Sequence, residues 1–95
     1  MGRRIWSYLV VLVLLSSLTS GCYYFSAKKE MRNAGQLVSQ LKGTGGEVRV
    51  PYEYCSAEKF LEVSRMEFNE GDYKQAKEFA IRSKSAAEAG LSKVK

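Results

Sequence analysis

Few residues of this chain have the type and spacing that acid–base or nucleophilic chemistry requires. Glu58 and Glu62 lie one helical turn apart, a spacing that could serve a general acid and a general base. Lys59 and Arg65 stand beside them, so we interpret all four as surface ion-pairing residues. The chain contains no histidine that could activate the Cys55 thiol, and no metal-ligand spacing. The sequence therefore predicts no enzyme, no small-molecule substrate, no metal and no cofactor.

The cysteine with the clearest chemistry is Cys22, which follows a secretory leader. A basic N-terminus precedes an apolar run at residues 9–15, and small residues then lead up to Ser20 and Gly21. This order is typical of a signal peptide that is cleaved after the small residues. The apolar stretch at 5–18 is interrupted by serines and is shorter than the roughly 20 residues of a membrane-spanning helix. It therefore argues against the alternative, an uncleaved anchor helix.

The segment that ends at Cys22 resembles the lipobox of bacterial lipoproteins, with Thr19 where that family usually has leucine. The resemblance implies a signal peptide at residues 1–21 and cleavage between Gly21 and Cys22. It also implies a diacylglycerol on the Cys22 thiol and a fatty acyl chain such as palmitate on the new amino end. Tyr23 stands where the enterobacterial sorting rule has aspartate for retention. By that resemblance we expect the periplasmic face of the outer membrane rather than the inner membrane.

The mature chain would be a single small domain without a nucleic-acid-binding surface. Removing residues 1–21 from 95 leaves 74 residues, with 13 Lys and Arg against 10 Asp and Glu, or a net charge of +3. These charges are interspersed, and no basic stripe with aromatic residues predicts nucleic-acid binding. Once Cys22 carries lipid, Cys55 has no partner in its own chain, which leaves a free thiol or an intermolecular disulfide as the alternatives.

An amphipathic helix is predicted at residues 22–42, directly after the lipid anchor. Apolar residues recur there at steps of 3 and 4, as one helical face requires. The aromatic residues Tyr23, Tyr24 and Phe25 fit either a collar at the membrane interface or packing against other helices. That face consists of Tyr24, Ala27, Met31, Ala34, Val38 and Leu41.

Three glycines within residues 43–46 predict a flexible linker at residues 43–50, with residues 48–50 extended before Pro51. Residues 51–92 then predict an antiparallel helical hairpin that turns at Gly71, with 93–95 as a tail. Large residues of its first helix face mostly small residues of the second in this register. We expect the hairpin core to consist of Tyr54, Ala57, Leu61, Phe68, Tyr73, Ala76, Ala80 and Ala87.

The hairpin sequence resembles a tetratricopeptide repeat at its corner, where that family has the pattern carried here by Gly71, Tyr73 and Ala76. A repeat array needs several copies to bury its faces, and this chain contains one. The longer stretch from Pro51 to Ala87 is similar to a group of small bacterial envelope lipoproteins with a helical-hairpin domain of unknown function. The resemblance implies an all-α envelope lipoprotein and supplies no activity.

Four apolar residues lie opposite the predicted hairpin face: Cys55, Val63, Met66 and Ile81. We expect helix 22–42 to cover them as the third member of a bundle, and a protein partner is the alternative. The predicted function is a membrane-anchored adaptor or accessory subunit with an unidentified protein partner. The alternative is a structural lipoprotein that self-associates through the stripe of helix 22–42.

Overall fold

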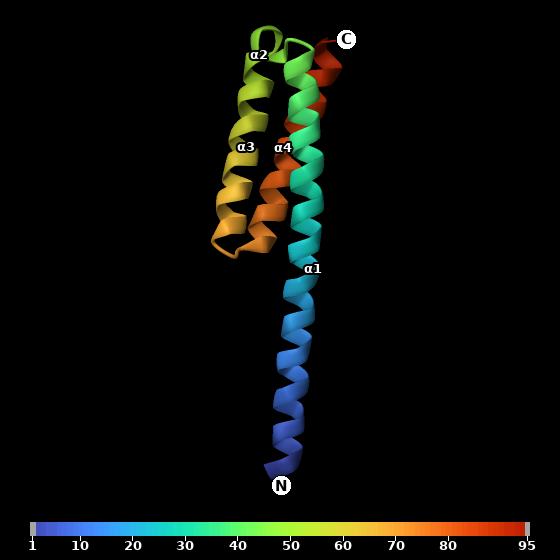
Figure 1. Cartoon of the computed structure of the whole chain (residues 1–95), viewed down its shortest axis with the longest axis vertical. Helices are drawn as coiled ribbons and strands as arrows, with labels where there is room; N and C mark the ends of the chain where they lie inside the picture. Colours follow the sequence, from blue (N-terminus) through green and yellow to red (C-terminus); the bar gives the residue numbers. More distant parts are fainter. Residues whose placement is uncertain (1, 95) are drawn as a thin grey trace.

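The described residues form helices and no strand. The structure is a computed structural model that describes residues 2–15 and 22–94. Helix α1 (Gly2–Gly43) is followed by α2 (Gly46–Arg49), α3 (Pro51–Asn69) and α4 (Tyr73–Val94). The C-terminal half of α1 packs with α3 and α4, while its N-terminal half extends alone beyond the bundle (Figure 1). The predicted all-α fold with an antiparallel hairpin is therefore confirmed. With α3 and α4, α1 forms a three-helix bundle.

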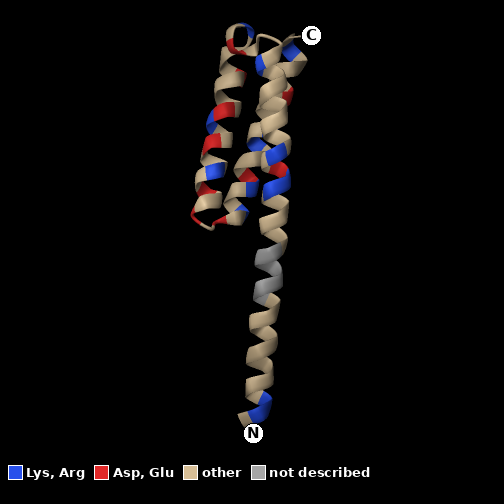
Figure 2. Ribbon diagram, in the orientation of Figure 1, with Lys and Arg blue, Asp and Glu red and all other residues tan. Residues whose placement is uncertain are grey.

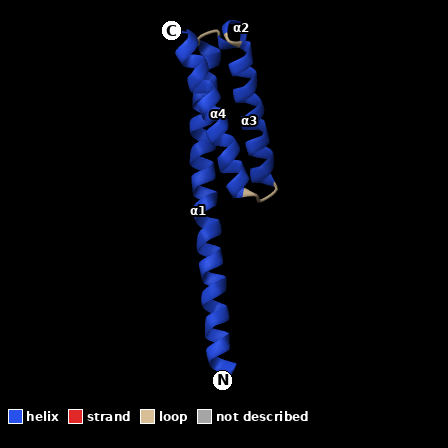
Figure 3. Cartoon of the chain, turned by 180° about the vertical axis from the view of Figure 1, so that it is seen from behind, coloured by secondary structure: helices blue, strands red, loops and turns tan. Residues whose placement is uncertain are grey.

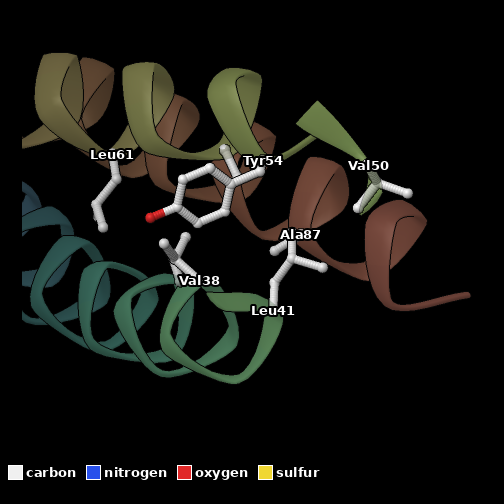
Figure 4. Packing of buried hydrophobic residues seen from close by; sticks show 8 residues of the cluster. Val38, Leu41, Val50, Tyr54, Leu61 and Ala87 are labelled. Carbon is white, nitrogen blue, oxygen red and sulfur yellow. The ribbon is translucent and has the colours of Figure 1, made fainter. Parts of the chain in front are cut away.

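The predicted helical faces form the core of this bundle. Seen from behind, α4 lies beside α1 along the length of the bundle (Figure 3), and α1 packs mainly on α4 and less on α3. The face predicted for residues 22–42 is buried at Ala27, Ala34, Val38 and Leu41. Tyr54 projects between the helices toward Val38 (Figure 4). Of the predicted hairpin core, Phe68 and Tyr73 are half-buried, and the buried members are Tyr54, Ala57, Leu61, Ala76, Ala80 and Ala87.

Two buried serines hold α3 and α4 in register. The Ser83 hydroxyl donates to the Ala57 carbonyl at 2.6 Å, and the Ser64 hydroxyl donates to the Ala76 carbonyl at 2.5 Å. Both serines are completely buried, and a buried hydroxyl without a partner would be costly. The small side chains along this contact bring the two backbones close enough for these bonds. Ala57 and Ser83 therefore lie opposite each other, in agreement with the predicted antiparallel hairpin.

The hairpin turn uses the residues that the sequence indicates. Gly71 has a φ of 87°, a left-handed conformation that glycine adopts without strain. The Asp72 carboxylate accepts a hydrogen bond from the Gln75 backbone N–H at 3.1 Å and so caps α4. Pro51 begins α3, where its missing N–H leaves no helical bond unmade.

The prediction that residues 48–50 are extended is wrong for Val48 and Arg49, which belong to α2. Gly45 has a φ of 80°, and its carbonyl accepts from the N–H groups of Val48 and Arg49 at 3.1 and 2.9 Å. These local bonds close one helical turn. The steric restriction that proline places on the preceding backbone therefore keeps only Val50 out of helical conformation, with φ −133° and ψ 65°.

The predicted tail at 93–95 is also partly wrong, because α4 continues to Val94. The Arg49 guanidinium donates to the Val94 carbonyl at 3.1 Å, which satisfies an acceptor at the helix end. The Lys93 ammonium forms an ion pair with the Glu53 carboxylate of α3. Contacts from α2 and α3 thus stabilise the last turn of α4, which ends at Val94.

Ala80 and Ala89 provide a test of the hairpin register. Ala80 is completely buried and Ala89 is exposed on the same helix. We expect Ala80→Leu to lower the free energy of unfolding by about 1–3 kcal/mol, because the extra atoms overpack a close helix contact. Ala89→Leu should leave it nearly unchanged. Thermal melts of the two variants give the comparison, and equal melting temperatures would contradict this register.

Candidate functional site: the Cys22 end and the groove between α1 and α3

Cys22 lies between the exposed N-terminal part of α1, which we call the arm and whose described residues are 2–15, and the part of α1 that belongs to the bundle. Each residue at 2–15 is exposed, and the large apolar residues of this arm are between 44% and 70% exposed. Cys22 is itself exposed as a free thiol. From Tyr23 onward α1 begins to be covered, and Ala27 is completely buried. Gly21, the other residue of the predicted cleavage site, lies outside the described residues.

In the part of the chain that the structure describes, no helix combines the length and apolarity needed to cross a bilayer.

The aromatic residues that follow Cys22 divide between packing and exposure. The Tyr24 ring lies 5.2 Å from that of Phe68 and 5.1 Å from that of Tyr73, measured between ring centroids. Phe68 and Tyr73, both assigned to the hairpin core from the sequence, also contact each other, with their ring centroids 5.1 Å apart. Tyr24 therefore closes the base of the bundle. Phe25 is 72% exposed and meets Tyr24 edge-on, so its outer surface is open.

A groove of about 490 Å³ runs between α1 and α3, on the side where α1 packs less closely. Gly35 and Ser39 form part of its α1 wall, and Arg65 extends across it, with its Nη2 atom 3.9 Å from the position a Gly35 Cβ would take. Carboxylates from α3 and the thioether of Met66 complete an opening that is part polar and part apolar. The lining residues are Gly35, Val38, Ser39, Glu58, Leu61, Glu62, Arg65, Met66 and Asn69.

Three of the four residues predicted to be covered by the first helix are open to solvent. Cys55, Met66 and Ile81 are exposed, and Val63 is half-buried. The expectation that α1 covers them is wrong for the three exposed residues, because α1 packs mainly on α4 and less on α3. Met66, 55% exposed, is the one of the four that lines the groove.

The carboxylates near the groove are tied to neighbouring side chains. The Tyr54 hydroxyl donates to Glu58 Oε1 at 2.7 Å, and this bond raises the pKa of Tyr54 to about 12. Glu62 forms an exposed ion pair with Lys59 at 3.7 Å, as predicted from the sequence. The hydrogen bond from Lys93 lowers the pKa of Glu53 at the far end of the bundle.

The described residues bring together no group of three side chains that could hold a metal ion. Cys55 is an exposed free thiol on α3, and its partner or lack of one in solution stays a prediction. Sequence reasoning missed the groove, because Gly35 and Ser39 carry no periodic apolar signal. They line the groove only because α1 packs beside α3 in the folded chain.

Comparison with protein-family models, curated proteins and solved structures finds no match to this chain. The lipobox and tetratricopeptide-like resemblances therefore stay predictions.

Proposed function

We propose that this chain is an envelope lipoprotein, held by lipid on Cys22 at the periplasmic face of the outer membrane, whose helical bundle binds a protein partner. The observation that carries the proposal is the position of Cys22. It is exposed at the junction between an arm whose described residues are all exposed and a bundle that begins at Tyr23. Cleavage before Cys22 would remove the arm and leave the buried core of the bundle whole.

The adaptor role is supported by the groove between α1 and α3. Its mixture of an exposed thioether, carboxylates and a guanidinium is suited to an amphipathic segment of a partner protein. The alternative, self-association through the stripe of the first helix, has less support. That stripe is buried within the same chain at Ala27, Ala34, Val38 and Leu41.

The adaptor role can be tested by crosslinking in cells and affinity capture of the intact lipoprotein. We expect a defined partner that Met66→Lys releases, because the substitution places a charge in the groove without disturbing a buried contact. Ile81→Lys, on α4 and outside the groove, is the matched control and should retain the partner. Capture of copies of this chain alone would favour the structural alternative.

A further inference from the structure

One exposed face of α1 begins at the predicted lipid attachment point. Cys22, Phe25, Lys29 and Arg32 follow one another at steps of 3, 4 and 3, so they share one side of the helix. All four are exposed, whereas Ala27 and Ala34 on the other side are completely buried. Lys28 is exposed at the edge of this side. We call Lys28, Lys29 and Arg32 the basic face.

Among the described residues, the basic face has no carboxylate partner, and Lys28 Nζ lies over the Tyr24 ring at 5.1 Å from its centroid. None of the ion pairs between described residues includes Lys28, Lys29 or Arg32. The nearby Glu30 carboxylate lies 3.9 Å from the Lys84 ammonium of α4. Along α1 above this point, no charged residue follows until Lys42. Blue residues accordingly mark α1 near the base of the bundle (Figure 2).

The geometry of a helix directs this face toward the membrane. At about 1.5 Å per residue, Phe25 lies roughly 4.5 Å above Cys22, Lys28 roughly 9 Å, Lys29 roughly 10.5 Å and Arg32 roughly 15 Å. The polar headgroup layer of one leaflet is about 5–8 Å thick. Helical side chains lean toward the N-terminus, which here is the lipid-bearing end. The long cationic side chains therefore extend back toward the headgroups, and Phe25 lies at their level.

We propose that the basic face binds anionic phospholipid headgroups of the membrane that holds Cys22, with Phe25 inserted at the interface. This inference rests on the proposed lipid anchor. The proposal also predicts the direction in which the bundle tilts. The turn between α3 and α4 lies at the same end of the bundle as Cys22, and its carboxylates, Glu70 and Asp72, would be repelled by anionic headgroups. Lys74 and Lys77 of α4 follow that turn, and Lys77 lies over the Tyr23 ring at 6.0 Å. On α1 the one nearby carboxylate, Glu30, is half-buried and paired with Lys84, so the exposed side of α1 carries positive charge and faces the bilayer.

A tryptophan at position 25 can report this contact. The chain has one tryptophan, Trp6, in the leader, so the mature lipoprotein has none. Lipidated Phe25→Trp protein is reconstituted into vesicles with brominated acyl chains, made with or without about one third phosphatidylglycerol. We expect stronger quenching and a blue-shifted emission with the anionic lipid, and loss of this difference in high salt. Tyr52→Trp, 79% exposed at the distal end, should be unquenched in both.

Charge variants in the Phe25→Trp background identify the residues responsible. Lys29→Gln with Arg32→Gln should lower the ratio of docked to undocked protein roughly fivefold per cation removed. Lys42→Gln with Lys59→Gln removes the same charge from exposed positions farther from the anchor and should change little.

Three outcomes would overturn the proposal. Equal quenching in anionic and neutral vesicles would exclude binding to anionic headgroups. Quenching that follows protein density instead of lipid charge would assign the face to a second copy of this chain. If mass spectrometry finds no lipid on Cys22, the proposed function fails together with this inference, whereas a lipidated protein without charge dependence contradicts the inference alone.

Discussion

Cys22→Ala is expected to abolish incorporation of a fatty-acid probe and to leave the precursor uncleaved by the lipoprotein peptidase. The thiol is the atom that would receive the diacylglycerol, and alanine has no nucleophile in its place. The expected effect is complete loss of labelling. Because Cys22 is exposed and outside the core, the fold should be unaffected, so the loss cannot be attributed to unfolding.

The measurement is metabolic labelling with a clickable fatty acid, read together with the mobility of the precursor and mature bands. Cys55→Ala is the matched control, since Cys55 is the other exposed free thiol of the chain. It should label and mature normally. Normal labelling of Cys22→Ala would remove the basis of the proposed anchor.

Gly46→Ala is expected to destabilise the distal end of the bundle by about 1–3 kcal/mol, a large share of the stability of so small a domain. A Cβ at Gly46 would lie 2.5 Å from Leu41 Cγ and 2.6 Å from the Leu41 carbonyl oxygen. Leu41 is completely buried, and the carbonyl belongs to the backbone, so neither atom can move aside cheaply. Gly46 does not have a positive φ, so the cost comes from the clash and not from backbone strain.

Gly43→Ala is the matched control for this substitution. A Cβ there meets no atom within 4 Å, and Gly43 ends α1 in helical conformation. The control should therefore be neutral or slightly stabilising, since alanine favours a helix more than glycine does. Thermal melts should separate the two variants by several degrees for each kcal/mol. A Gly46→Ala protein that melts with the control would mean that Leu41 and its neighbours are not packed this closely.

Much of the hairpin could be predicted from sequence because its signals are local. The periodicity of Tyr54, Ala57 and Leu61 marks the buried face of α3 wherever the helix lies. Gly71 and Asp72 end one helix and begin the next through their own backbone and side-chain preferences. The proposed lipid site depends on the leader and Cys22 alone, and so it too could be read from the sequence, although the proposal itself awaits the labelling experiment.

The position of α1 could not be predicted in the same way. Periodicity shows which side of a helix is apolar. Because the hydrophobic effect is non-directional, it does not determine which other helix covers that side. The sequence thus determined the buried face of α1, whereas tertiary packing decided that α4 is its main neighbour and that Met66 stays open beside a groove. At the distal end, the packing of Leu41 depends on Gly46 and Gly90, because a side chain at either position would occupy the space that Leu41 fills. These close contacts join segments that are far apart in the sequence, and for that reason no local sequence pattern predicts them.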